Sequence, residues 1–113
     1  MATLTRRQER AVPVPQELLR SVVAYFDPVR VILFGSHARG EAGPDSDYDL
    51  LVVLDDDAPK EKQHWSAAWE ARKDFHGAVD VVPCRESAFR QRSRLRSSPL
   101  AEIAREAVVL YER

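Results

Sequence analysis

The pattern of hydrophobic positions switches between a helical and a strand period along the chain, which predicts alternating helices and strands. Apolar side chains recur at helical spacing over 15–26, and proline at the first of these positions suits the first turn of a helix. Asp27-Pro28 ends this helix, because the residue before a proline avoids the helical backbone. The β-branched and apolar run at 29–34 then predicts a buried strand, which Gly35-Ser36 closes before a short helix.

The central part of the chain predicts the most deeply buried strand. A loop rich in Gly, Pro, Asp and Ser occupies 40–46 and separates the short helix from a strand at 47–54. The uninterrupted apolar run inside 47–54 is typical of a central strand that is covered on both faces. The aspartates at 55–57 follow this strand, and we interpret them as a solvated turn.

A helix and a third strand follow this turn. Residues 59–76 predict the helix, and residues 78–82 predict a short strand that ends at Pro83. Trp65 and Trp69 lie one helical turn apart, so we interpret them as packing residues and not as a platform for stacking bases. The side of the helix that carries them would be formed by Trp65, Ala68, Trp69, Arg72 and Phe75.

The C-terminal part predicts two helices, at 85–95 and 98–106, and a last strand at 108–111. The arginines of the first of these helices are scattered around it, which favours a solvated face, with contact to a partner or to RNA as the alternative. Residues 1–12 are polar and lack a sustained period, so we expect a flexible arm there, followed by a single domain at 13–113.

Composition narrows the class of protein. The chain has 113 residues, enough for one domain, and its 44% hydrophobic and 31% charged residues are typical of a soluble globular protein. A net charge of −1 does not favour binding to nucleic acid or to an anionic membrane, and no apolar run is long enough to span a bilayer. The single cysteine, Cys84, excludes an intrachain disulfide and favours a cytoplasmic protein, and no neighbouring base marks it as a nucleophile.

Two aspartates at the start of the central strand are the first candidates for chemistry. Asp47 and Asp49 are two positions apart, so their side chains project from one face of the strand while Tyr48 projects from the other. Two carboxylates held this close repel each other, and a hard divalent cation with oxygen ligands, Mg²⁺ or Mn²⁺, is the usual compensation. Asp80, the one charge in the strand at 78–82, can face the same cations if that strand lies beside the central one.

The Gly35-Ser36 turn offers a complementary feature for phosphate binding. Its glycine lets the backbone approach a ligand closely, and its hydroxyl and backbone N–H groups can hold phosphate oxygens. Arg39 comes one helical turn after Ser36, so it could reach the same anion or brace the acidic loop. With two cations about 3.5–4 Å apart at the aspartates, such a site would activate an attacking oxygen and neutralise a leaving pyrophosphate.

Each candidate also has a plainer interpretation. The turn and the aspartates could be an ordinary loop and solvated acids, although their assembly between predicted strands favours a phosphate and metal site. Asp80 could be an edge-strand residue that pairs with an arginine. His37 fits a surface residue better than a catalytic one, while His64 and His76 have no partner for metal binding in the sequence.

A family resemblance rests on two neighbouring segments, residues 34–40 (FGSHARG) and 46–52 (SDYDLLV). They resemble the DNA polymerase β-like nucleotidyltransferase superfamily and are most similar to its minimal nucleotidyltransferase (MNT) branch. The spacing of Gly-Ser, ten residues and Asp-x-Asp is matched in full, and Asp80 is similar to the third carboxylate of the family. The resemblance covers about residues 15–111, and it implies an α/β (α+β) domain with a mixed β-sheet flanked by helices.

The resemblance also implies a reaction: transfer of a nucleoside monophosphate, usually AMP from ATP, to an acceptor hydroxyl. Gly35 and Ser36 would hold the triphosphate, Asp47 and Asp49 would bind two Mg²⁺ ions, and Asp80 would help to deprotonate the acceptor. MNT proteins often pair with a helical HEPN-domain toxin and adenylylate it, so we expect the antitoxin of such a pair. Two alternatives stay open: a small-molecule enzyme of the aminoglycoside-modifying type that acts as an oligomer, and a non-catalytic module that neutralises a toxin by contact.

Overall fold

The chain is described by a computed structural model that places residues 14–43, 46–94 and 107–113. The expected arm at 1–12 and the expected helix at 98–106 lie outside these residues. The described elements are α2 (Gln16–Phe26), β1 (Arg30–Phe34), α3 (Ser36–Arg39), β2 (Tyr48–Leu54), the 3-10 turn η1 (Lys60–Gln63), α4 (Trp65–Arg72), β3 (Val79–Arg85), α5 (Glu86–Ser93) and β4 (Val108–Glu112).

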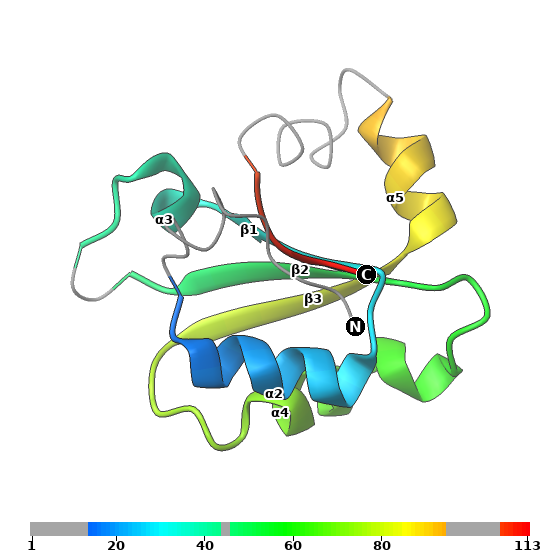
Figure 1. Cartoon of the computed structure of the whole chain (residues 1–113), viewed down its shortest axis with the longest axis horizontal. Coiled ribbons are helices and arrows are strands. Elements are labelled where there is room, and N and C mark those ends of the chain that lie inside the picture. The colour runs from blue at the N-terminus through cyan, green and yellow to red at the C-terminus, as the bar shows by residue number, and fades with distance from the viewer. Residues whose placement is uncertain (1–13, 44–45, 95–106) are drawn as a thin grey trace.

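The described strands form one mixed sheet in the order β3-β2-β1-β4 (Figure 1). β1 pairs antiparallel with both β2 and β4, whereas β2 and β3 run parallel. This arrangement brings the end of β1 and the starts of β2 and β3 to the same edge of the sheet. The expected mixed sheet flanked by helices is therefore confirmed.

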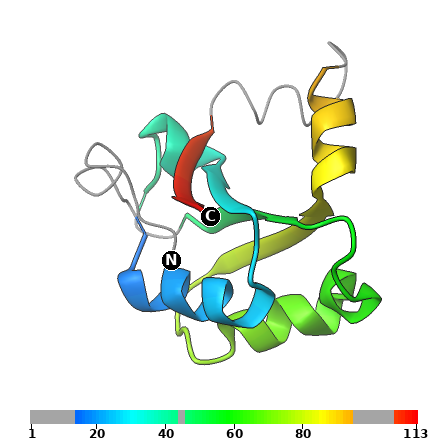
Figure 2. The same cartoon turned by 45° about the vertical axis from the view of Figure 1, so that its right-hand side comes forward.

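Helices cover both faces of the sheet, and β2 shows how the sequence allows this. Its residues Leu50, Val52 and Leu54 pack into the core cluster that contains α2 and α4. Leu51 and Val53 face the other way and pack with Ala88 and Phe89 of α5. Figures 1 and 2 show α2 and α4 together on one side of the sheet and α5 on the other. The prediction of a central strand covered on both faces is confirmed.

The prediction of a long helix at 59–76 is wrong in two respects: the length of the helix and the side that it buries. His64 adopts an extended backbone with φ −78° and ψ 153°, so the segment divides into η1 and the shorter α4. The buried residues of α4 are Ala67 and Ala71, while Trp65 is 82% and Trp69 is 53% exposed. Small alanine side chains let α4 lie close to the core, and the two tryptophans therefore do not have the packing role that we expected.

The third strand is also longer than predicted, because it continues through Pro83 to Arg85. β3 is an outermost strand of the sheet and has a neighbouring strand on one side only. A proline is tolerated in such a strand, because its missing N–H does not interrupt hydrogen bonding between inner strands. Arg85 then fixes the end of the strand by donating from Nη1 to the carbonyl oxygen of Asp56 at 2.6 Å. Its Nε donates to Gln63 Oε1 at 2.9 Å, which ties β3 to η1.

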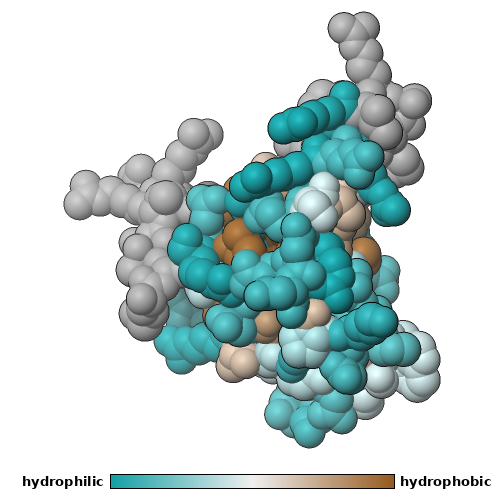
Figure 3. Space-filling model, turned by 90° about the vertical axis from the view of Figure 1, so that its right-hand side faces the viewer, coloured by the Kyte–Doolittle hydropathy of each residue, from teal (hydrophilic) through white to brown (hydrophobic). Residues whose placement is uncertain are grey.

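The acidic turn after β2 and the surface of the molecule are largely polar. Asp55 Oδ2 forms an ion pair with Arg113 Nη1 at 2.8 Å. Asp56 and Asp57 are exposed, in agreement with the solvated turn that we predicted. Hydrophilic side chains dominate the face seen in Figure 3, and apolar side chains emerge there only in small areas. Within the described residues, no helix combines the length and the apolar character needed to cross a membrane.

Candidate active site

The turn at the end of β1 brings Ser36 to the same edge of the sheet as the start of β2. Gly35 has φ 78° and ψ −157°, a conformation that is essentially restricted to glycine. Its carbonyl oxygen accepts a 3.1 Å hydrogen bond from the backbone N–H of Arg39, and that of Ser36 accepts one of 2.9 Å from Glu41. These bonds close the single turn of α3 and fix Ser36 at its first position.

Gly35 and Asp49 are in direct contact. The antiparallel register places Asp49 opposite Phe34, the residue before the glycine. A Cβ atom added to Gly35 would overlap the Asp49 Oδ2 atom and would lie 3.2 Å from Asp49 Cγ. The space that any other residue would fill with its side chain is therefore taken by this carboxylate, so the predicted phosphate-binding turn and the predicted metal-binding strand meet here.

Asp49 and Asp80 are also brought together, because they are register partners in the parallel pair of β2 and β3. This confirms the condition that we set for Asp80, namely that its strand lies beside the central strand. Asp80 is exposed and Asp49 is half-buried. Asp47 is exposed and lies one residue before β2 begins. Although Asp80 belongs to an edge strand, its position opposite Asp49 is what the active-site interpretation requires.

The electrostatics of these residues show that they share one environment. Burial raises the pKa of Asp49 above its ordinary value, and the negative charges of Asp80 and Asp47 raise it further. The charges of His37 and Arg39 act in the opposite direction on the pKa of Asp49. Arg39 Nε also pairs with Glu41 Oε1 at 2.8 Å, at the start of the loop that precedes β2.

His37 differs from the surface residue that we expected. Its ring is half-buried and stacks on Tyr48, with ring centroids 4.0 Å apart and an angle of 19° between the planes. Its Nε2 atom lies 3.1 Å from the carbonyl oxygen of Ser46. Sequence reasoning missed this arrangement, and the available signal was the alternation that turns Tyr48 away from the two aspartates and toward the α3 side of β2.

The donor set at this edge is composed of carboxylate oxygens, which are the ligands that Mg²⁺ and Mn²⁺ prefer. Among the described residues, no three side chains of His, Cys, Asp or Glu already form a closed metal-binding group. Asp47, Asp49 and Asp80 carry like charges, and a bound cation would offset their mutual repulsion. The contact of Asp49 with the backbone of Gly35 holds one member in place.

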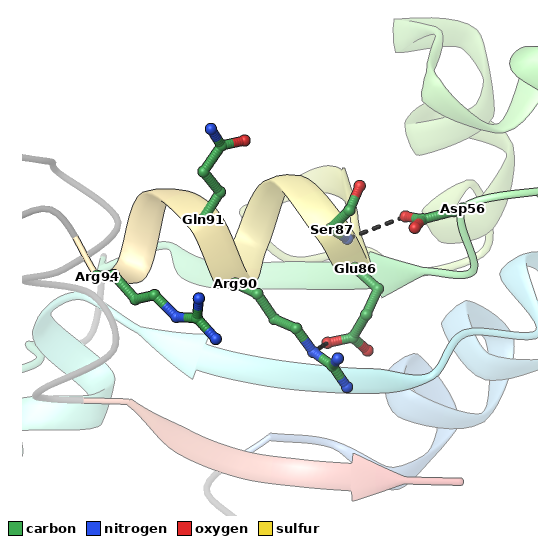
Figure 4. Close-up of a pocket in the computed structure, with 6 residues that line it drawn as sticks. All are labelled: Asp56, Glu86, Ser87, Arg90, Gln91 and Arg94. Atoms are coloured by element: carbon green, nitrogen blue, oxygen red, sulfur yellow. Dashed lines mark hydrogen bonds and ion pairs between the residues drawn. The ribbon is translucent and has the colours of Figure 1, made fainter.

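A separate depression of about 470 Å³ lies along α5, toward the opposite end of β2 (Figure 4). Asp56 Oδ1 accepts a 2.9 Å hydrogen bond from the backbone N–H of Ser87, and Arg90 Nε pairs with Glu86 at 3.1 Å. The exposed Arg90 agrees with the solvated face predicted for these arginines. The lining residues are Asp56, Glu86, Ser87, Arg90, Gln91 and Arg94.

Comparison with known protein families shows which family this chain belongs to. A family model described as a nucleotidyltransferase domain matches residues 15–106. The chain belongs to this nucleotidyltransferase domain family. The match includes the Gly35 turn, Asp47, Asp49 and Asp80, so these candidate site residues all lie inside the nucleotidyltransferase domain. No protein among those with curated functions matches the chain.

Solved structures show the same fold. A candidate nucleotidyltransferase from Sulfolobus solfataricus has a TM-score of 0.58 at 24% identity, with 94% of this nucleotidyltransferase domain and 84% of that chain covered. A toxin–antitoxin complex with AMP-PNP has a TM-score of 0.59 at 19% identity, covering 88% and 75%. A mutant of the toxin–antitoxin MntA–HpeT has a TM-score of 0.57 at 16% identity, with the same two coverages.

Proposed function

We propose that this nucleotidyltransferase domain uses Mg²⁺ to transfer AMP from ATP to a hydroxyl group of a partner protein, and that it acts as the antitoxin of a toxin–antitoxin pair. The observation that carries this proposal is the contact between Gly35 and Asp49. It joins a turn suited to phosphate oxygens with a carboxylate suited to a cation, and nucleotidyl transfer needs both at one place.

The metal would be held by Asp47, Asp49 and Asp80, with Mn²⁺ as a possible substitute for Mg²⁺. When bound, the metal supplies charge neutralisation at the reacting phosphate and at the leaving pyrophosphate. Burial is the largest cause of the raised pKa of Asp49, and the charges of Asp80 and Asp47 raise it further; these neighbouring carboxylates support the assignment, because they would favour a bound cation. Gly35 and Ser36 would hold the triphosphate, and Arg39 would add a positive charge beside it.

Asp80 would accept the proton of the acceptor hydroxyl, and its exposure supports a large acceptor. Asp80 lies on an edge strand that is open to solvent, and Val82, two residues further along the same face, is 43% exposed. A protein can bring a hydroxyl to such an open edge without being enclosed. The exposed surface around Asp80 therefore favours a protein acceptor over an enclosed small molecule.

The antitoxin role is supported by the structural neighbours. One neighbour is a toxin–antitoxin complex with AMP-PNP, an analogue of ATP. The MntA–HpeT mutant carries aspartate-to-glutamate changes at two positions that are two residues apart, the same spacing as Asp47 and Asp49. We propose that the acceptor of this chain is the toxin of its own pair, a protein with a HEPN domain.

Calorimetric titration with ATP, in the presence and absence of Mg²⁺, tests the metal and nucleotide part of the proposal. Mg²⁺ should strengthen ATP binding to the wild type, and this effect should disappear in the Asp47→Asn/Asp49→Asn variant. The Asp55→Asn/Asp57→Asn variant is a matched control, since these aspartates have the same spacing but follow the other end of β2. Equal ATP affinity with and without Mg²⁺ in the wild type would contradict the proposal.

Co-expression of this chain with the product of the neighbouring gene, followed by intact-mass spectrometry of that product, tests the acceptor. We expect the mass of the partner to rise by one AMP unit with the wild type and to stay unchanged with Asp80→Asn. If the partner is neutralised without any added mass, the non-catalytic alternative becomes the better account.

A further inference from the structure

His37 occupies a position between the two halves of the proposed site without belonging to either. It is the second residue of α3, directly after Ser36, and its Nε2 atom reaches across to the carbonyl oxygen of Ser46, directly before Asp47. A carbonyl oxygen can only accept a hydrogen bond, so this 3.1 Å contact requires a proton on Nε2 of His37. His37 therefore bridges the proposed phosphate-binding turn and the start of the proposed metal-binding strand.

The ring of His37 rests on a second support. It stacks on Tyr48, whose ring in turn meets Phe75 edge-on, with a centroid separation of 6.3 Å. Tyr48 and Phe75 both pack against the core cluster of α2 and α4. The backbone N–H of Tyr48 donates to the carbonyl oxygen of Ala78, just before β3. The imidazole is thus fixed to the core on one side and can hold the Ser46 carbonyl on the other.

On the N-terminal side of Asp47, the segment that His37 holds has few other attachments among the described residues. Ser46 N donates to the Gly43 carbonyl at 3.2 Å, and Ser46 Oγ accepts from Gly43 N at 2.9 Å. Both of these bonds lie within the loop, so they give it a local shape without fixing it to the body of the protein. The His37 contact joins the loop to α3, and hence to the turn that contains Ser36.

We propose that His37 is a positioning residue: its hydrogen bond to Ser46 sets the position of Asp47 relative to Ser36. The proposal rests on the function proposed above. Because Asp47 lies outside the hydrogen-bonded part of β2, its position depends on the loop more than that of Asp49 does. Loss of the hydrogen bond should therefore weaken the binding of the metal that Asp47 shares, even when the fold is intact.

Two substitutions separate the hydrogen bond from the stacking contact. His37→Phe keeps an aromatic ring for Tyr48 but has no donor for the Ser46 carbonyl. His37→Gln loses the ring, but its amide nitrogen can reach the place of Nε2 and donate. The measurement is the Mg²⁺ concentration that gives half of the maximal gain in ATP affinity by calorimetry. Thermal melting of each variant is recorded alongside.

We expect His37→Phe to raise this Mg²⁺ concentration about tenfold and His37→Gln to change it by about twofold or less. A role in packing alone gives the reverse order, since phenylalanine preserves the stack. Equal Mg²⁺ dependence in His37→Phe and the wild type would overturn the inference, as would a loss of Mg²⁺ response that only follows a large fall in melting temperature. If the wild type itself shows no Mg²⁺ dependence, the proposed function has failed, and this outcome is distinguishable from failure of the His37 role alone.

Discussion

The Asp49 carboxylate occupies the space beside Gly35 where a side chain would otherwise begin. Glycine is thus required at this position for two independent reasons: the backbone has φ 78°, and a neighbouring carboxylate fills the space. Any other residue at this position would both strain the turn and displace Asp49. The same contact that would assemble the active site therefore also constrains the fold.

Gly35→Ala should lower the free energy of unfolding by about 3 kcal/mol, because the strained backbone and the overlap with Asp49 add up. Gly40→Ala is the matched control: Gly40 also has a positive φ of 74°, but an added Cβ would meet nothing within 4 Å. We expect it to cost about 1 kcal/mol. Urea denaturation measures both values. Equal losses in the two variants would show that the overlap with Asp49 has no effect on stability.

Asp49→Asn should make the protein more stable at neutral pH. The pKa of Asp49 is raised above its ordinary value of 3.8, so the folded state holds this proton more tightly than the unfolded chain does. The contribution of Asp49 to stability is therefore greatest below pH 3.8 and is lost as the pH rises through the raised pKa. Solvent screening limits the gain from Asp49→Asn to about 0.2–1 kcal/mol.

Thermal melts of Asp49→Asn and the wild type across pH, with divalent cations removed by a chelator, measure this gain. The difference should be present at neutral pH and should shrink toward zero as the pH falls below the ordinary range of an aspartate. Asp57→Asn serves as the control, since Asp57 is exposed on the turn at the other end of β2. A variant that is less stable than the wild type at neutral pH would show that Asp49 stabilises the fold without a cation.

Ser36→Ala should weaken ATP binding in the presence of Mg²⁺ by about ten- to a hundredfold, the effect of one lost hydrogen bond to a charged phosphate. Ser66→Ala, an exposed position on α4, provides the control and should bind ATP like the wild type. Calorimetry measures both affinities. An unchanged affinity in Ser36→Ala would remove this hydroxyl from the proposed nucleotide site.

Asp80→Asn separates binding from transfer. The substitution keeps the size and polarity of the side chain but removes the charge that would accept the proton of the acceptor hydroxyl. We expect the variant to fold and to bind its partner, with transfer of AMP to the partner reduced by at least about a hundredfold. Circular dichroism melts verify the fold before the transfer assay. Wild-type transfer rates in Asp80→Asn would exclude Asp80 as the base.

Most of the sheet and the residues of the candidate site could be predicted from the sequence, because both depend on local patterns. The alternation of Asp47 and Asp49 around Tyr48 follows from strand geometry, and the buried run in β2 follows from its composition. The position of Asp80 opposite Asp49 could be predicted only on the condition that their strands are neighbours. The order and register of two parallel strands depend on contacts between distant parts of the chain.

The errors lie where tertiary packing outweighed local preference. Trp65 and Trp69 have the spacing and the hydrophobic area of packing residues, yet Ala67 and Ala71 face the core. Pro83 is a reliable end for an inner strand, but its place on the sheet edge let β3 continue. Strand alternation gives the side to which Tyr48 points, but its stacking on His37 also depends on where α3 packs, which no local pattern describes.

The two exposed tryptophans make the protein's own fluorescence a reporter of one surface. They are the only tryptophans in the sequence, and both lie on α4. Their emission already comes from a water-exposed environment in the folded state, so unfolding should shift its wavelength little, and fluorescence would give only a small signal for the unfolding transition. A molecule that covers the tryptophans of α4 would shift the emission toward shorter wavelengths. A nucleotide bound at the Gly35-Ser36 turn would leave the emission unchanged.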